Sequence, residues 1–208
     1  MPPVNFRLLL VTDRTQTGGR SLPSLIEQAV NAGLPAVQLR ERDLSTGELL
    51  ALACEIRSIT LPRAVPLLVN DRVDLALAMN LDGVHLRANS LPVPVAHRLV
   101  GTDRLVGVST HSLSEVEQAN RDGADYVLFG PIFDTPSKRP FGPPLGLAVL
   151  TEVCRHSTIP VFAVGGVTSA SVSDVRGAGA HGVAVIGAIL AHDDVAAATR
   201  SMLAVLAP

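Results

Sequence analysis

The sequence has little cysteine, no excess of positive charge and no long apolar segment. Its 208 residues contain two cysteines, Cys54 and Cys154, whose spacing fits neither a metal site nor a disulfide framework, so we expect both to be buried small hydrophobes. The 17 Lys and Arg residues are balanced by 19 Asp and Glu, and the net charge of −2 excludes a broad basic surface for nucleic acid. No apolar run reaches the ~18 residues of a transmembrane helix, so we expect no membrane partner.

The start of the chain also lacks the features of a secretory signal. Residues 1–14, MPPVNFRLLLVTDR, have neither the charged start nor the small-residue cleavage site of such a signal. No linker, charge block or low-complexity stretch divides the rest of the sequence. We therefore expect one cytoplasmic domain over residues 1–208.

The sequence does contain a regular alternation of eight short apolar runs with longer amphipathic segments. Hydrophobic residues make up 47% of the chain and charged residues 17%, which is enough apolar material for one large core. The short runs are rich in Val, Leu and Ile without strict alternation, as is typical of parallel strands covered on both faces. We expect strands within residues 6–13, 36–42, 65–71, 82–87, 104–111, 125–133, 159–166 and 181–189.

The segments between these runs carry start and stop signals of helices. Ser112 and Glu115 form a capping-box pattern, and Gly123 ends that segment. Helices are expected over residues 21–33, 45–61, 112–123, 146–156, 169–178 and 193–206, with weaker ones from Asp71 and from Pro92. Eight strand–helix units in about 200 residues predict an α/β protein with a (β/α)8 fold, the TIM barrel. A doubly wound open sheet is the alternative, but no G-x-G-x-x-G motif opens a helix after the first strand.

In a (β/α)8 barrel the functional residues lie at the carboxyl ends of the strands, and polar residues of this chain gather at those positions. Gln38, Arg40 and Arg42 follow one another with a period of two, which predicts that all three point to one face of the second strand. Large polar side chains on a buried strand are costly unless they pair with carboxylates, such as Glu41 or Asp71, or bind an anion.

Glycines at the ends of the last two strands suggest a phosphate site. Gly165-Gly166 and Ile186-Gly187 would expose backbone N–H groups to an anion at the mouth of the barrel. The alternative is that these glycines serve only tight turns between strand and helix. A long segment with five prolines, residues 130–146, follows the sixth strand, and loops of this length are often functional lids.

Two histidines have different expected roles. His111 follows the fifth strand and precedes a capped helix, so its imidazole is a candidate proton carrier at the rim. The alternative is a structural histidine. Ser109, two residues earlier on the same face, is expected to position that imidazole, whereas His85 lies inside a strand and is expected in the core.

An ordered series of segments carries a family resemblance. LVTDR, VQLRERD, LLVNDRVDLALA, DGVHL, GVSTHS, GADYVLFGPIFDTPSK, IPVFAVGGV and GVAVIGAI run from Leu10 to Ile189 and cover nearly the whole chain. Together they resemble the thiamine phosphate synthase/TenI superfamily of barrels. The resemblance implies one of two activities. Thiamine phosphate synthase joins a pyrimidine diphosphate to thiazole phosphate with Mg²⁺, whereas TenI-type enzymes aromatise a thiazole phosphate carboxylate by a proton shift without metal.

Departures from the synthase pattern favour the second activity. Ser90 stands where the synthases carry a metal-binding Asp, and Arg87 stands where they carry Gly. Asp71, the other ligand that the resemblance implies, would be left alone, although Mg²⁺ usually takes one or two carboxylates beside the phosphates. Arg42 replaces a Lys and Gly187 replaces a frequent Ser. We therefore expect no cofactor and no metal, with Mg²⁺ at Asp71 only if the chain is a synthase.

The resulting prediction is a thiazole tautomerase, an isomerase, in which His111 shuttles the proton and Arg40 pairs with the substrate carboxylate. The alternatives are a divergent thiamine phosphate synthase, a transferase, and a non-catalytic regulator that binds thiazole phosphate. The expected partner is a phosphorylated thiazole, and a homo-oligomer is left open. The residues expected to bind substrate or phosphate are Gln38, Arg42, Asn70, Ser109, Thr135, Ser137, Lys138, Gly165, Gly166, Ile186 and Gly187.

Overall fold

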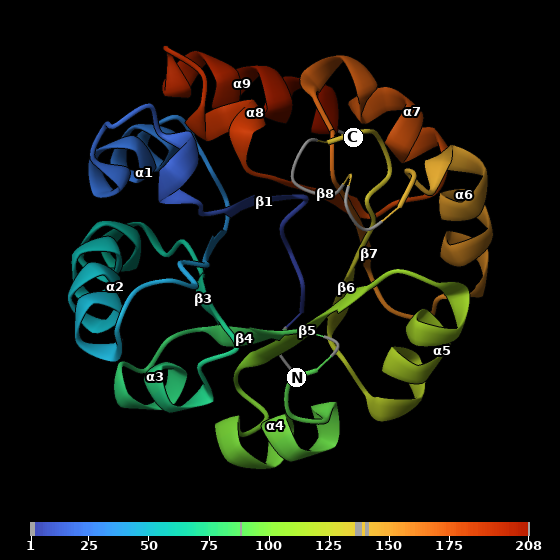
Figure 1. Ribbon diagram of the computed structural model, residues 1–208, viewed down its shortest axis with the longest axis horizontal. Helices are drawn as coiled ribbons and strands as arrows, with labels where there is room; N and C mark the ends of the chain where they lie inside the picture. The colour runs from blue at the N-terminus through green and yellow to red at the C-terminus, as the bar shows by residue number, and fades with distance from the viewer. Residues whose placement is uncertain (1–2, 88, 136–138, 140–141, 208) are drawn as a thin grey trace.

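The computed structural model describes residues 3–87, 89–135, 139 and 142–207, within which eight parallel strands close into a barrel (Figure 1). Each strand pairs with the next one along the chain, and β8 pairs with β1 to complete the barrel. The strands are β1 (Leu8–Val11), β2 (Val37–Leu39), β3 (Leu67–Asn70), β4 (Gly83–Leu86), β5 (Leu105–Thr110), β6 (Tyr126–Phe129), β7 (Val161–Val164) and β8 (Gly182–Val185). This arrangement confirms the predicted (β/α)8 barrel.

Helices follow the strands along the chain and form a ring around the barrel (Figure 1). They are α1 (Leu22–Asn31), α2 (Thr46–Thr60), α3 (Val73–Ala78), α4 (Val93–Val100), α5 (Leu113–Asp122), α6 (Gly146–His156), α7 (Val172–Gly177), α8 (Gly187–Leu190) and α9 (Val195–Leu206). Short 3-10 helices are η1 (Arg14–Gln16), η2 (Leu61–Arg63) and η4 (Ser169–Ser171). The expected segment 169–178 is thus divided between η4 and α7, and α8 is an addition that the sequence did not predict.

Local side-chain hydrogen bonds explain where two of these helices begin. At α2, Ser45 and Glu48 form a complete capping box: the Ser45 hydroxyl accepts from the Glu48 N–H at 3.4 Å, and the Glu48 carboxylate accepts from the Ser45 N–H at 2.9 Å. At α5 only half of the predicted box forms. The Ser112 hydroxyl accepts from the Glu115 N–H at 3.3 Å, but the Glu115 carboxylate accepts from the N–H of His111, one residue earlier.

The interior of the barrel is closed by aromatic side chains. Phe6, Tyr126 and Phe162 pack together with ring centroids 5.3–6.2 Å apart. Gly107 makes room for this cluster, since a Cβ at that position would overlap the Tyr126 ring. A larger aliphatic core fills the space between the strands and the helices. Because the barrel is packed rather than hollow, a ligand is expected at an end of the barrel and not in its interior.

The two cysteines differ from the prediction. Cys154 is half-buried, and burial raises the pKa of its thiol to about 11. Cys54 is exposed, so its expected burial is wrong. The reason is its place on α2, where Leu49, Ala53 and Ile56 form the buried stripe and residue 54 faces away from it. In the part of the chain that the structure describes, no helix combines the length and the apolarity needed to cross a bilayer.

Candidate functional site

The ends of β1 and β2 are tied together at the mouth of the barrel. The Thr12 hydroxyl accepts from the Arg40 N–H at 2.8 Å, and the buried Glu41 carboxylate accepts from the Arg14 N–H at 3.1 Å. The Arg14 guanidinium also pairs with Asp43 at 2.5 Å. Glu41 therefore forms its hydrogen bonds with Arg14. The alternative suggested from the sequence, in which Glu41 pairs with Arg40 or Arg42, is wrong.

The same hydrogen bond ends β2 earlier than expected. In a regular parallel ladder the Arg40 N–H would donate to the Thr12 carbonyl, but here it donates to the Thr12 hydroxyl, and the strand stops at Leu39. Arg42 therefore lies in the following turn and is exposed, so the prediction that it shares one strand face with Gln38 is wrong.

Arg40 has the environment of an anion-binding residue. Its side chain is partly buried, and among the described residues no carboxylate forms a salt bridge with it. Burial is the largest cause that lowers the pKa of the Arg40 guanidinium, and the nearby charges of Arg42 and Arg87 lower it further, against the opposite effects of Asp13 and Glu41. A partly desolvated cation next to other cations is costly until an anion binds.

Gln38 and Asn70 form a polar pair at the ends of β2 and β3. Gln38 is 1% exposed, and its Nε2 donates to Asn70 Oδ1 at 3.5 Å. Its Oε1 is buried and has no hydrogen-bond partner among the described residues. Since buried polar atoms are normally paired, this oxygen is a candidate acceptor for an N–H or O–H group of a ligand.

Asp71 is engaged on both carboxylate oxygens. Oδ2 accepts from Nε of Arg87 at 2.9 Å and also from its Nη2, while Oδ1 accepts from the hydroxyl of Ser90. Ser90 is fixed in turn, because its oxygen accepts from the Arg87 N–H at 2.8 Å. The sequence had offered Asp71 as a partner for the arginines of the second strand, but its partner is Arg87 of the fourth.

These residues do not fit the magnesium site that the family resemblance implies. A guanidinium and a hydroxyl occupy both oxygens of Asp71, and Ser90 replaces the second carboxylate. Within the described residues, no group of three or more His, Cys, Asp or Glu side chains is arranged to hold a metal. Mg²⁺ needs anionic oxygen ligands and is repelled by a neighbouring cation, so Asp71 is not a suitable ligand as it stands.

His111 is held in one orientation at the end of β5. Its ring Nδ1 lies 2.5 Å from the Gly130 carbonyl oxygen, and its backbone N–H donates to the Glu115 carboxylate at 2.5 Å. A carbonyl can only accept, so Nδ1 carries the proton and Nε2 is the nitrogen with the lone pair. The residue is exposed, so we expect Nε2 to be the ring nitrogen that hydrogen-bonds a ligand or transfers a proton.

Ser109 contacts His85 rather than His111. The His85 ring lies 2.8 Å from Ser109 Oγ through Nε2 and 3.1 Å from the Tyr126 hydroxyl through Nδ1. The expected contact of Ser109 with His111 is wrong, because β5 ends at Thr110 and the alternation of side chains does not continue beyond it. His85 is 1% exposed, and burial lowers its pKa to about 3, so it is the neutral core histidine expected from the sequence.

Gly165 and Gly166 are packed under the loop that follows β6. The Phe133 N–H donates to the Gly165 carbonyl at 3.0 Å. Gly166 has a φ of +66°, and a Cβ there would lie 2.6 Å from the Asp134 carbonyl oxygen and 2.7 Å from Phe133 Cβ. The turn and the loop above it therefore already require glycine. Their role in binding phosphate stays a prediction.

Gly187 lies beside the loop that follows β1. Ile186 precedes α8 and Gly187 is its first residue, and a Cβ on Gly187 would lie 2.7 Å from Gln16 Oε1. Gln16 is held by Asp13, whose carboxylate accepts from Gln16 Nε2 at 2.9 Å. Arg20 also supports α8 by donating to the carbonyl of its last residue at 2.7 Å. Gln16 and Arg20 were not predicted as site residues from the sequence, because they come next to α8 only when β1 pairs with β8.

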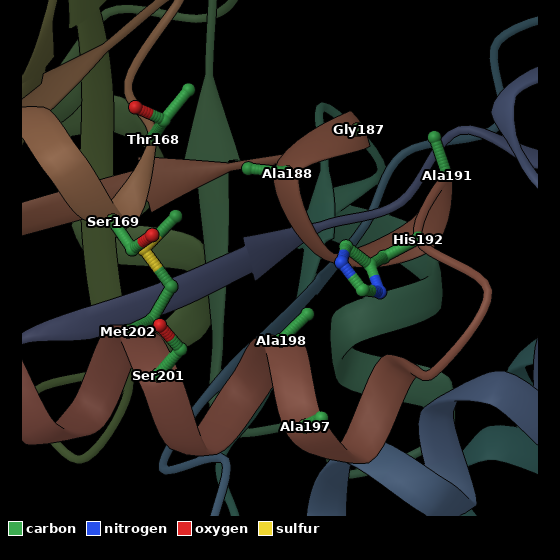
Figure 2. Close-up of a pocket in the computed structure, with 10 residues that line it drawn as sticks. All are labelled: Thr168, Ser169, Gly187, Ala188, Ala191, His192, Ala197, Ala198, Ser201 and Met202. Atoms are coloured by element: carbon green, nitrogen blue, oxygen red, sulfur yellow. The ribbon is translucent and has the colours of Figure 1, made fainter.

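A cavity of about 450 Å³ opens on the other side of α8, between η4 and α9 (Figure 2). Gly187 is the predicted site residue that lines it, so the cavity adjoins the rim but does not contain the arginines of the mouth. The other residues that line the cavity are Thr168, Ser169, Ala188, Ala191, His192, Ala197, Ala198, Ser201 and Met202. Apart from His192 and Met202, their side chains are small.

The remaining expected residues lie on the segment after β6. Thr135 is half-buried at its start, and Asp134 pairs with Arg139 at 2.6 Å. Ser137 and Lys138 lie outside the described residues.

Comparison with known proteins decides the family. A family model described as thiamine monophosphate synthase matches residues 8–189. The chain belongs to the thiamine monophosphate synthase family. A member from Chloroflexus aurantiacus named thiamine-phosphate synthase is 47% identical over 203 residues, which are 98% of this chain and 94% of that relative. One of the same name from Clostridium novyi is 40% identical over 199 residues, 96% of this chain and 98% of the relative.

A solved structure shares the fold closely. The thiamine phosphate pyrophosphorylase from Pyrococcus furiosus is 30% identical, with a TM-score of 0.87 over 96% of this chain and 95% of that chain. The resemblance predicted from the sequence segments is thus confirmed, and the chain is a thiamine-biosynthesis enzyme. The names of the relatives favour the synthase, which the sequence analysis gave as the alternative, over the tautomerase that it preferred.

Proposed function

We propose that the chain is a thiamine-phosphate synthase, which joins a pyrimidine diphosphate to thiazole phosphate and releases diphosphate. The observation that carries this proposal is the 47% identity with a protein of that name along nearly the full length of both chains. Two arginines at the mouth of the barrel support it, since the reaction needs sites for a diphosphate and for a phosphate. Arg40 is partly buried without a salt bridge to any described carboxylate, and Arg42 lies in the next turn.

The reaction forms a C–N bond and breaks a C–O bond. The ring nitrogen of the thiazole attacks the methylene carbon of the pyrimidine, and the diphosphate leaves with the electrons of the C–O bond. No proton has to move, so the protein's task is to align the two substrates and to stabilise the leaving charge. Arg40 and Arg42 would supply hydrogen bonds and charge to the diphosphate.

The other expected residues have roles suited to two substrates. Gln38 Oε1, which is buried and has no partner within the described part of the chain, would accept a hydrogen bond from an N–H group of the pyrimidine. The backbone N–H groups near Gly166 and Gly187, at the ends of β7 and β8, would bind the phosphate of the thiazole at the same mouth of the barrel. Asn70 ends β3, Ser109 lies near the end of β5, and Thr135 lies on the segment after β6; we propose that all three contact substrate. The further polar and backbone groups proposed for the phosphate side are those of Ser137, Lys138, Gly165 and Ile186.

Product analysis tests the proposal directly. Incubation of the protein with the pyrimidine diphosphate and thiazole phosphate should give thiamine phosphate and diphosphate in equal amounts. Arg40→Ala should lower kcat/KM by about 10²-fold, because it removes charge-assisted hydrogen bonds to the leaving group. Arg98→Ala is the matched control, since Arg98 is exposed on α4 away from the mouth. Absence of thiamine phosphate under all conditions would contradict the synthase.

The tautomerase stays a second candidate because of two observations. Asp71 is occupied by Arg87 and Ser90, and His111 is exposed at the rim with its Nδ1 held by the Gly130 carbonyl. An isomerisation needs a proton carrier and no metal, and Arg40 would then bind the carboxylate of the thiazole. Aromatisation of a thiazole phosphate carboxylate, followed by absorbance, distinguishes this function. A non-catalytic regulator would bind thiazole phosphate and show neither reaction.

A further inference from the structure

The salt bridge between Asp71 and Arg87 joins the ends of two neighbouring strands. Asn70 of β3 is in register with His85 of β4, and the Asp71 N–H donates to the His85 carbonyl at 2.9 Å. This pairing sets the residues that follow each strand side by side. Arg87 is thus held at a fixed place on the rim by Asp71, and its own backbone N–H is held by Ser90 at 2.8 Å.

The anchored guanidinium still has hydrogen-bonding capacity for a ligand. Of its five N–H donors, Asp71 accepts one from Nε and one from Nη2, and no other described residue accepts from the Nη1 group or the second Nη2 hydrogen. The Arg87 side chain is 41% exposed and that of Asp71 is 23% exposed. The guanidinium is therefore accessible to a ligand, and its charge is close enough to Arg40 to lower the pKa of the Arg40 guanidinium.

Arg87 also lies close enough to Arg40 for their charges to interact. The charges of Arg42 and Arg87 lower the pKa of the Arg40 guanidinium, against the opposite effects of Asp13 and Glu41, and among the described residues no carboxylate forms a salt bridge with Arg40. Arg40 and Arg42 follow β2, and Arg87 follows β4, with β3 between them. A diphosphate, with several charged oxygens, can contact guanidinium groups from both sides of β3 at once, which suits it better than a single carboxylate.

We propose that Arg87, anchored by Asp71 and Ser90, is a cation of the protein itself that binds the diphosphate group of the pyrimidine substrate without a divalent metal at Asp71. The inference rests on the proposed synthase function. It makes Arg87 a specificity-determining residue for the leaving group, at the position where the family resemblance implied a metal.

Binding of inorganic pyrophosphate tests this inference. Calorimetric titration should show binding in the presence of a chelator, with an affinity that millimolar Mg²⁺ raises less than about threefold. Arg87→Ala should weaken metal-free binding by about tenfold or more, and Arg87→Lys by less. Arg98→Ala, which removes the same charge from an exposed position on α4, should leave the affinity unchanged. Pyrophosphate binding by the native protein that requires Mg²⁺ would overturn the inference, whatever the variants do.

A converse variant gives a second test. Arg87→Gly combined with Ser90→Asp removes the resident cation and places two carboxylates together, so the double variant should bind Mn²⁺ in a spectroscopic titration and should need a divalent ion to bind pyrophosphate. The native protein should bind no Mn²⁺ at this site. Native Mn²⁺ binding that is lost in Asp71→Asn would count against the proposal.

The failure of this inference is separable from failure of the proposed function. Metal-free pyrophosphate binding that depends on Arg87, without thiamine phosphate formation from the two substrates, would keep the anion site and reject the synthase. Thiamine phosphate formation that depends strictly on Mg²⁺ would keep the synthase and reject the role of Arg87.

Discussion

At the scale of single residues, His111 distinguishes the two candidate reactions. Joining the two substrates requires no proton transfer, so His111→Ala should reduce thiamine phosphate formation by no more than about tenfold, the loss of one hydrogen bond. Isomerisation of the thiazole needs a proton carrier, and the same variant should reduce it by about 10²–10⁴-fold. Thiamine phosphate formation and thiazole isomerisation, both measured on one preparation of the variant, show which reaction depends on His111. A large loss of the synthase reaction alone would show that His111 positions a substrate instead.

His85 should make the protein sensitive to acid. Burial lowers its pKa from 6.5 to about 3, so between these values the unfolded chain binds a proton that the folded chain does not. The free energy of unfolding should therefore fall as the pH decreases from about 6.5 towards 3, by up to about 1.4 kcal/mol per pH unit. Denaturant titrations at pH 7 and pH 5 measure this slope. In His85→Asn, which cannot titrate, the slope should be smaller by about that amount.

The same histidine also joins three strands through its ring. His85→Ala would remove the partner of both the Tyr126 hydroxyl and Ser109 Oγ and leave a cavity in the barrel interior. We expect a loss of about 2–4 kcal/mol in the free energy of unfolding. An equal loss in His85→Asn would indicate that the ring's volume contributes more than its hydrogen bonds.

At the scale of elements, the loop after β6 and the turn after β7 should behave as one unit. Gly166→Ala should destabilise the protein by about 1–3 kcal/mol and weaken binding of phosphorylated and unphosphorylated thiazoles alike, because the added Cβ displaces residues 133–134. Gly101→Ala is a matched control: Gly101 has a φ of +81° but nothing within 4 Å of the added Cβ. A loss confined to the phosphorylated ligand would instead indicate direct contact of Gly166 with the phosphate.

The elements themselves were largely predictable from the sequence, and the exceptions have physical causes. The starts of α2 and α5 follow from the caps Ser45 and Ser112, and the end of α5 follows from Gly123. Helix α8 has four residues, too few to show an apolar stripe. Strand β2 ends early because a side-chain oxygen of Thr12 replaces a backbone carbonyl in its ladder, which depends on the neighbouring strand.

The candidate site was less predictable than the elements. The ends of the strands indicated which residues meet at the mouth, since every parallel strand of a barrel ends on the same side. They did not indicate which of those residues pair with one another. Arg87 pairs with Asp71, and Ser109 pairs with His85, only because the register of β3, β4 and β5 sets them side by side.

At the scale of the whole molecule, the seam between β1 and β8 closes the barrel. Gly182 opens β8, and a Cβ there would overlap the backbone of Arg7 at this seam. Gly182→Ala should therefore lower the free energy of unfolding by about 1–3 kcal/mol. Gly177→Ala, at the end of α7 with nothing near the added Cβ, should be neutral or slightly stabilising. Chemical denaturation of both variants measures their free energies of unfolding. Equal values would show that the seam between β1 and β8 accommodates the added Cβ.

The bracing of α8 by the loop after β1 has a consequence for how the protein is made. During translation β1, Gln16 and Arg20 are synthesised early. Helix α8, which Gln16 and Arg20 contact, is synthesised only near the end. Until β8 emerges, β1 has an unpaired edge and one rim of the mouth is absent. A chain that ended before residue 181 would lack both β8 and α8, so we expect it to leave the barrel open and the binding site incomplete.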